Sequence, residues 1–433
     1  MTSGPDGERT TTAGFSEPAR TREENLGERL LGSLLDRAHL IPPRLVGPLV
    51  AQELTASGAR DVAIWLQDYD QRMLRPVPGR GLAGESLAID DSLPGEAFVT
   101  DDRVEEPLPD GSVRLYLPML DGSDRVGVLG LTLPALDDVD RRIAQRAAGL
   151  VADLVVTKSM YTDTFAQIRT NQPMTVAAQL QWQTLPPLAM TTPDIDLAGA
   201  VEPAYEVGGD GFDYALDEHV LHLAVLDAMG HGLEAASMAT VVTAAYRHGR
   251  RVGRSLTELY AEMDEVVARA FPGRFATAQF ARLDSETGEL SWVNAGHPPA
   301  LWLRDRKVVG ELLGRPTRPV GFGGATPRVH RVQLEPGDLL LFFTDGVVEE
   351  RIGHGEQFGE ARLREALEKT AAEQRSAAET VRRLSHALVD ARRGRTSDDA
   401  SLLLVQWKGP PRDDELARDV PESRPTGDGG LRS

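Results

Sequence analysis

The sequence predicts an α+β fold in which helices cover a mainly antiparallel β-core. From Asp196 onward, short apolar runs of strand type alternate with polar turns, as in the runs 275–283 and 289–294 that flank the turn 284–288. Between these runs, apolar residues recur at helical spacing in the stretches 233–247, 256–271 and 361–393. Strands mixed with long helices are expected to pack as layers, with the helices on the outer faces of the β-core.

The composition fits a protein with more than one folded unit. The chain has 433 residues, of which 41% are hydrophobic and 26% charged, so it can bury real cores in two or three domains. With 47 Lys and Arg against 66 Asp and Glu, the formal net charge is −19, which argues against a nucleic-acid partner. Because the sequence has no cysteine, disulfides, thiolate metal sites and a cysteine nucleophile are excluded.

The two ends of the chain show no folding or targeting signal. Residues 1–25 and 409–433 are poor in apolar residues and are expected to be a disordered arm and tail. The first twenty residues lack the apolar core of a secretory signal, and no run approaches ~18 apolar residues. We therefore expect a cytoplasmic protein with no membrane partner.

The first folded region, residues 26–135, is expected to begin with helices and continue into strands. Apolar residues recur at helical spacing over residues 26–56, apart from a break at Pro42 and Pro43. The alternating run 62–67 predicts a strand, and two later runs on either side of a polar turn, 114–120 and 126–133, predict a hairpin.

This order of elements resembles a GAF sensor domain, and the resemblance covers about residues 26–157. The block between Arg80 and Asp110 is then the expected ligand-facing region, where an unknown small molecule would bind, and it can equally be plain loop. A thioether-linked bilin is excluded because the chain has no cysteine.

Residues 136–187 are expected to form a helical signalling linker. Apolar residues follow helical spacing from Val139 to Val155, and a second helix over about residues 174–185 stops at Pro186 and Pro187. We expect this linker to pair with its copy in a homodimer. The alternative is a surface helix that packs only on its own domain.

Four aspartates lie where apolar runs of the second half begin or end. They are Asp210 after a Gly-Gly pair, Asp227 after the run 219–226, Asp345 after the run 338–343, and Asp398 before the run 401–407. Each alone is also a typical cap or turn residue. Together they would meet at one edge of the β-core, where clustered carboxylates repel each other unless a cation binds them. Hard divalent cations favour oxygen ligands, so the sequence predicts a Mg²⁺ or Mn²⁺ enzyme.

The loop after Asp227 has the residues that such a centre needs. Gly230 and Gly232 permit a tight loop with an exposed backbone. Asp227 could there reach two cations, and the carbonyl of Ala228 could add an oxygen ligand. His231 is a candidate general acid, or it only braces the loop.

Residues 175–407 resemble the PPM-type metal-dependent protein serine/threonine phosphatases, in the SpoIIE/RsbU branch of bacterial regulatory phosphatases. The resemblance implies an αββα sandwich over residues 188–408. Its specificity comes from six motifs that keep their order along the chain. They are Leu185–Pro187, Val207–Asp210, Asp227–Gly232, Asn294–Pro299, Thr344–Gly346 and Asp398-Asp399.

The resemblance also implies a binuclear Mn²⁺ or Mg²⁺ centre. By motif position, Asp227 would bridge both ions, Ala228 would offer its carbonyl, and Asp210 would hold one ion directly or through water. Asp345 and Asp398 would bind the other ion. A hydroxide formed at such a centre would hydrolyse the phosphate ester without a covalent intermediate.

Two further aspartates and one glycine qualify this assignment. Asp213 and Asp399 are implied only as accessory carboxylates. Gly211 stands where the family usually has an aromatic residue, which is expected to loosen the loop beside Asp210. The alternative function is therefore a catalytically inactive phosphatase-fold module that binds a partner. The block 208–212 also has a superficial similarity to the Gly-Gly-Asp-Glu-Phe block of diguanylate cyclases, but it lacks the Glu.

The resemblance implies a protein substrate. Members of this branch typically dephosphorylate a serine or threonine on a STAS-type anti-sigma-factor antagonist. The N-terminal sensor domain would control that activity through the helices of residues 136–187.

Overall fold

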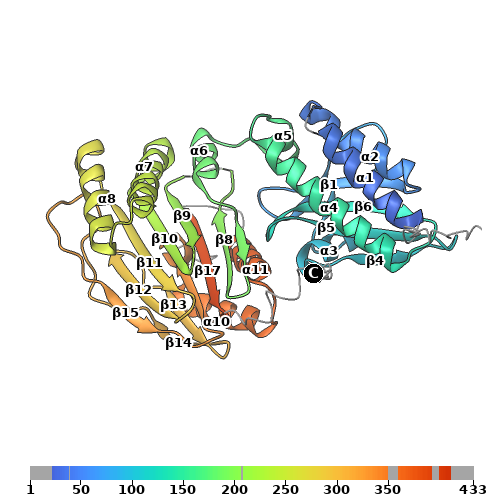
Figure 1. The fold of residues 1–433 in the computed structure, drawn as a ribbon. Helices are drawn as coiled ribbons and strands as arrows, with labels where there is room; N and C mark the ends of the chain where they lie inside the picture. Colours follow the sequence, from blue (N-terminus) through green and yellow to red (C-terminus); the bar gives the residue numbers. More distant parts are fainter. Residues whose placement is uncertain (1–21, 39, 206–207, 350–358, 393–398, 411–433) are drawn as a thin grey trace, which may run out of the picture.

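The computed structural model describes residues 22–38, 40–205, 208–349, 359–392 and 399–410, and it shows two folded regions side by side (Figure 1). Helices α5 (Thr164–Arg169) and α6 (Val176–Thr184) lie at the junction between them. Within the described residues, none of the helices combines the length and the apolar composition that crossing a bilayer requires.

The N-terminal region is built on an antiparallel sheet with the strand order β3-β2-β1-β6-β5-β4. Its strands are β1 (Arg60–Gln67), β2 (Met73–Pro76), β3 (Leu87–Ala88), β4 (Val104–Pro107), β5 (Val113–Asp121) and β6 (Asp124–Leu133). Its helices are α1 (Arg22–Ala38), the 3₁₀ turn Pro43–Leu45, α2 (Val46–Ala56), α3 (Leu93–Thr100) and α4 (Asp138–Ser159). The predicted helices and hairpin are present, and the block from Arg80 to Asp110 contains β3, α3 and β4.

Helix α4 packs against the sheet of the N-terminal region. Asp137 caps its first turn, because the side chain accepts hydrogen bonds from the amides of Val139 and Asp140. The helix buries Ala147, Val151 and other apolar residues in the same core as α1, α2 and the sheet. The stretch expected as a linker thus contains three helices, of which α4 and α5 contribute side chains to the N-terminal core.

The C-terminal region contains two antiparallel sheets. One has the strand order β15-β12-β11-β10-β9, and the other β14-β13-β16-β17-β8-β7. The strands are β7 (Ala189–Thr191), β8 (Ile195–Glu202), β9 (Asp210–Asp217), β10 (Val220–Ala228), β11 (Ala276–Asp284), β12 (Glu289–Ala295), β13 (Leu301–Arg304), β14 (Lys307–Glu311), β15 (His330–Gln333), β16 (Leu339–Phe343) and β17 (Ala400–Trp407).

These sheets form the two inner layers of an αββα sandwich. One apolar core, which includes Phe212, Trp292 and Phe342, lies between the sheets. Helices α7 (Gly232–Arg251) and α8 (Leu256–Ala270) cover the β9–β12 side, and α10 (Gly359–Ala372) and α11 (Ala377–Arg392) cover the other (Figure 1). The layered α+β fold predicted from the sequence is confirmed. The expected stretch 361–393 contains α10 and α11, with Gln374 at φ +55° between them.

Candidate metal centre

Strands β9 and β10 bring the first two predicted ligands together. The strands pair in antiparallel register, and Asp210 lies directly opposite Asp227. Directly opposed residues of such a pair have Cβ atoms about 5 Å apart and project on the same face. The long apolar run of β10 fixes this register, because a slip by one residue would move its buried side chains to the other face.

The second sheet brings two more carboxylates to the same place. Strand β16 ends at Phe343, so Asp345 follows it at the start of the short helix α9 (Gly346–Glu349). Strand β17 begins at Ala400, directly after Asp399. Asp399 is buried, and its Oδ2 accepts a hydrogen bond of 3.4 Å from the amide of Asp210. Carboxylates from the two sheets therefore meet at one edge of the sandwich.

Thr344 joins the two sheets at this edge. Its hydroxyl donates to Oδ2 of Asp210 and accepts a hydrogen bond of 2.9 Å from the amide of Ser401. The Thr344 side chain is completely buried. The sequence motif around Thr344 indicated no role for this residue, and its position shows that it orients the Asp210 carboxylate.

The electrostatics of the cluster favour a bound cation. Burial raises the pKa of Asp210 well above its usual range, and the charges of Asp227, Asp399 and Asp345 raise it further. The carboxylates of this cluster repel one another and offer only oxygen atoms as ligands, which suits a hard divalent cation. Within the described residues, no three acidic or imidazole side chains have the spacing of a complete metal site. Asp398, the predicted fourth carboxylate ligand, lies outside the described residues.

The loop after Asp227 has the predicted shape. Gly230 and Gly232 adopt φ values of +100° and +74°, which favour glycine. Ala228 ends β10, and its amide donates to the carbonyl of Gly209 at 3.0 Å. His231 is exposed at the N-cap of α7, where its side chain makes no capping bond. It therefore lies at the rim of the centre rather than within it.

Two other polar residues near the centre have structural roles. The carboxylate of Asp213 is buried and pairs with Arg247 at 2.6 Å and Arg250 at 2.9 Å, both on α7. Asp213 therefore anchors α7 on β9. Burial lowers the pKa of His297 to about 3, and this neutral imidazole bonds to the Thr277 hydroxyl at 2.8 Å. Asn294 also bonds to the His297 backbone, so these contacts indicate that His297 orders its loop.

Helix α6 contacts the centre through a residue that sequence reasoning missed. The buried side-chain amide of Gln181 donates to the backbone carbonyl of Asp210 at 2.8 Å. The only sequence signal was the Gln-rich character of the segment before Leu185-Pro186-Pro187. Any movement of α6 would thus be transmitted to the backbone at Asp210.

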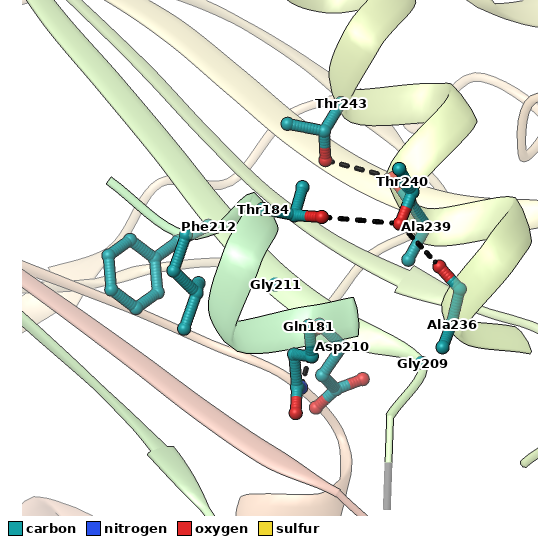
Figure 2. A pocket seen from close by; sticks show the side chains of 11 residues that line it. Gln181, Thr184, Gly209, Asp210, Gly211, Phe212, Ala236, Ala239, Thr240 and Thr243 are labelled. Carbon is teal, nitrogen blue, oxygen red and sulfur yellow. Dashed lines mark hydrogen bonds between the residues drawn. The ribbon is translucent and has the colours of Figure 1, made fainter. Parts of the chain in front are cut away.

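A small cavity lies between α6, β9 and α7, beside Asp210 (Figure 2). Its volume is about 10 Å³, roughly the room that one water molecule needs. Threonines from both helices line it, namely Thr184, Thr240 and Thr243. Gly211 also lines it, and a Cβ there would meet only Leu226 Cδ1, at 4.0 Å. The cavity thus lies beside the glycine that was expected to loosen the loop at Asp210.

Comparison with known proteins matches the C-terminal region to a protein family. Residues 217–408 match the protein family described as Stage II sporulation protein E (SpoIIE). Residues 217–408 are a SpoIIE-family domain. The resemblance to the SpoIIE/RsbU branch is thereby confirmed for this region. Strand β9 with Asp210 precedes the matched residues, although it belongs to the same sheet as β10.

Curated relatives match parts of this chain at low identity. Phosphoserine phosphatase RsbP of Bacillus subtilis is 29% identical over 151 residues, which are 33% of this chain and 37% of RsbP. Phosphoserine phosphatase RsbU of the same organism is 24% identical over 237 residues, 54% of this chain and 69% of RsbU. The chain thus spans about a third of the length of RsbP.

Solved structures are also similar in part. The RsbU and RsbW domains of Rv1364c from Mycobacterium tuberculosis match with 30% identity and a TM-score of 0.43, over 50% of this chain and 62% of that one. The SiaA-PP2C domain of Pseudomonas aeruginosa matches with 23% identity and a TM-score of 0.45, over 53% of this chain and 94% of that one.

Proposed function

We propose that this chain is a metal-dependent protein serine/threonine phosphatase. The observation that supports it most is the cross-strand pair of Asp210 and Asp227, which faces Asp345 and Asp399 from the second sheet in a SpoIIE-family domain. The names of RsbP and RsbU, both phosphoserine phosphatases, support a phosphoserine or phosphothreonine substrate.

Two Mn²⁺ or Mg²⁺ ions would be held by carboxylates and one carbonyl. The proposed ligands are Asp210, Asp227, Asp345, Asp398 and the carbonyl of Ala228. When bound, such ions lower the pKa of coordinated water and neutralise phosphoryl charge. Thr344 fixes the orientation of Asp210. His231, exposed at the rim, would protonate the leaving serine oxygen, directly or through water.

The proposed substrate is a phosphorylated STAS-type anti-sigma-factor antagonist. This choice, like the homodimer through residues 136–187, depends on the family resemblance. A catalytically inactive partner-binding module is the second candidate, and Gly211 with its adjacent cavity is the observation that favours it. The carboxylates described above support the active enzyme.

Control by the N-terminal region would act through α6. Tyr69 lies between β1 and β2, and its ring centroid is 4.7 Å from that of Trp182 on α6. The guanidinium of Arg169 lies over the Tyr69 ring at 4.5 Å. Trp182 is adjacent to Gln181, which bonds to the backbone of Asp210. A shift of the N-terminal region would therefore move the helix that supports the metal centre.

A second contact between the two regions supports the same control. Arg125 of β6 bonds to Glu379 of α11 at 3.3 Å, and both side chains are buried. Glu379 also pairs with Arg382 at 2.8 Å, and Arg382 reaches Asp90 of the N-terminal region at 2.6 Å. Removing one partner of a buried ion pair leaves an uncompensated charge, so this network fixes how the regions dock.

The phosphatase proposal is tested by hydrolysis of p-nitrophenyl phosphate with and without Mn²⁺. We expect Mn²⁺-dependent turnover that falls by roughly 100-fold or more in Asp227→Asn, because neutral Asn cannot replace a bridging carboxylate. Circular dichroism should show an intact fold, because Asp227 lies near the end of β10 and is not part of the apolar cores. Full activity in the variant would contradict the ligand assignment, and Mn²⁺ binding without turnover would support the inactive module.

A separate variant tests the proposal that the N-terminal region controls activity through α6. Tyr69→Ala removes the aromatic contact with Trp182, and Mn²⁺-dependent turnover is expected to change at least threefold. Leu40→Ala is the control, since Leu40 is an exposed apolar residue of the N-terminal region outside residues 136–187. Equal rates for both variants and the wild type would count against control through α6.

A further inference from the structure

An apolar surface lies directly beside the loop of Asp227. The amide of Met229 donates to the carbonyl of Phe275 at 3.0 Å, which continues the register in which Ala228 pairs with Ala276. The Phe275 ring stacks on Phe322, with centroids 5.2 Å apart and an interplanar angle of 29°. We name Met229, Phe275 and Phe322 the apolar rim.

Two of the three side chains of the apolar rim are exposed, and Phe275 is partly buried. Phe322 is 57% exposed and Met229 is 40% exposed. Contiguous exposed apolar side chains can mark a binding site, whereas scattered ones are common. The rim adjoins the residues of the metal centre, because Met229 lies two residues after Asp227 and two before His231. A molecule on the rim would therefore also reach the centre.

The loop that presents Phe322 is held in place. The buried carboxylate of Asp264 on α8 accepts hydrogen bonds from the amides of Gly321 at 2.7 Å and Gly323 at 3.0 Å. Gly321 adopts φ +109°, and a Cβ there would lie 2.6 Å from the carbonyl oxygen of Arg274. Close packing and two hydrogen bonds thus fix an aromatic ring in an exposed position. This preorganisation reduces the entropy that binding costs.

The guanidinium of Arg274 lies against Gly230, in the loop that follows Asp227 and Met229. Nη1 of Arg274 is 3.4 Å from the position that a Cβ on Gly230 would take, so the guanidinium covers the glycine loop. Its Nη2 pairs with Glu234 at 2.8 Å, and the two side chains are 35% and 61% exposed. Exposed pairs of this kind contribute little stability. Arg274 can therefore exchange this partner for a phosphate, which guanidinium binds through two parallel hydrogen bonds.

We propose that the apolar rim and Arg274 form the docking surface for the phosphoprotein substrate. The occupant is a phosphoserine or phosphothreonine segment with a large apolar side chain beside the phosphorylated residue. Arg274 receives the phosphate as it enters the centre, and Phe322 packs on the apolar neighbour. This inference rests on the proposed phosphatase function and names how that site selects a protein substrate.

Charge explains why such a surface is needed. The chain has a net charge of −19, so a doubly charged phosphate group is repelled at long range. Apolar contacts do not depend on charge and are not screened by salt. An apolar anchor next to one arginine therefore offers attachment that the overall electrostatic field of the protein does not supply.

The test measures binding rather than turnover. The probes are two fluorescent ten-residue peptides with a central non-hydrolysable phosphonate analogue of phosphoserine, one with leucine and one with alanine on both sides of it. Their affinity for the full-length chain is measured by fluorescence anisotropy with Mn²⁺. We expect Phe322→Ala to raise Kd for the leucine peptide about fivefold or more, and to leave Kd for the alanine peptide within twofold.

Matched variants separate the two parts of the surface. Val252→Ala removes a side chain of similar exposure, 54%, at the far end of α7, and it should leave both Kd values unchanged. Arg274→Gln should raise Kd for both peptides roughly tenfold, because both contain the phosphonate. Arg269→Gln, which removes an exposed arginine paired with Glu265, is its control.

The outcomes distinguish this inference from the phosphatase proposal. Equal Kd values for the wild type and Phe322→Ala, or no binding of the leucine peptide by the wild type, would overturn the docking surface. A dimer that Phe322→Ala dissolves would assign the rim to a second copy and would also overturn it. Leucine-dependent binding without hydrolysis of p-nitrophenyl phosphate would support the docking surface and overturn the phosphatase.

Discussion

Strand β9 holds two buried aspartates in opposite electrostatic surroundings. In the middle of the strand, Asp213 pairs with Arg247 and Arg250 of α7. At the first residue of the strand, burial and the charges of three nearby carboxylates raise the pKa of Asp210, and the Thr344 hydroxyl donates a hydrogen bond that opposes this shift. The first arrangement compensates the charge within the protein and so stabilises the fold. The second leaves a negative cluster that a divalent cation would stabilise, which is typical of a functional site.

The largest expected effect is a difference in the free energy of unfolding between variants of these two aspartates. Asp213→Asn breaks a buried ion pair and leaves two arginines against a neutral amide, so we expect a loss of about 3 kcal/mol in the free energy of unfolding. Asp210→Asn removes a charge from a repulsive cluster and should not destabilise the metal-free protein. Urea unfolding in EDTA measures both. A loss of similar size in the two variants would show that both aspartates are structural.

Much of this comparison could be predicted from the sequence, because it depends on local patterns. Apolar runs located β10 and β16, and the motifs at their ends located Asp227 and Asp345. The aspartate after the Gly-Gly pair could be identified as a candidate ligand in the same way. The αββα layers followed from the alternation of strand and helix patterns together with the family resemblance.

The rest depends on contacts between distant segments, for which one sequence has no signal. The sequence indicated only an accessory role for Asp213. Its arginine partners lie 34 and 37 residues later on α7, and nothing in the sequence pairs them with it. The Thr344 hydroxyl reaches Asp210 across 134 residues, and only the packing of the two sheets determines that contact. The aromatic contact of Tyr69 with Trp182 likewise depends on how the two regions dock.

An effect of intermediate size is expected on metal affinity, and it tests whether Thr344 orients the Asp210 carboxylate for metal binding. Mn²⁺ at a hundredfold excess over Kd should stabilise the wild type by about 2.7 kcal/mol, seen as a higher Tm. Thr344→Val removes the hydroxyl and keeps the shape, so metal affinity should fall roughly tenfold. The Mn²⁺-induced increase in Tm would then be smaller by the equivalent of about 1.4 kcal/mol. An unchanged increase would show that Thr344 serves only to join the two sheets.

The smallest expected effect concerns Gly211, which lies between the two aspartates on β9. Glycine in a strand costs stability, and the cavity beside Gly211 has room for a methyl group because the nearest side-chain atom would be 4.0 Å away. Gly211→Ala should therefore raise stability by about 0.5 kcal/mol. Gly208→Ala is the contrasting variant, since its Cβ would lie 2.8 Å from the carbonyl oxygen of Ala177 and must displace the backbone of α6.

Thermal unfolding and Mn²⁺-dependent turnover, measured on both glycine variants, show what the cavity does. If Gly211 merely lacks a side chain, the alanine variant is more stable and its turnover stays within twofold of the wild type. If the loose packing lets α6 move relative to Asp210, the same variant is more stable but its turnover changes, because Gln181 joins that helix to the Asp210 carbonyl. A destabilised Gly211→Ala would show that the cavity is already filled by water bound to the surrounding threonines.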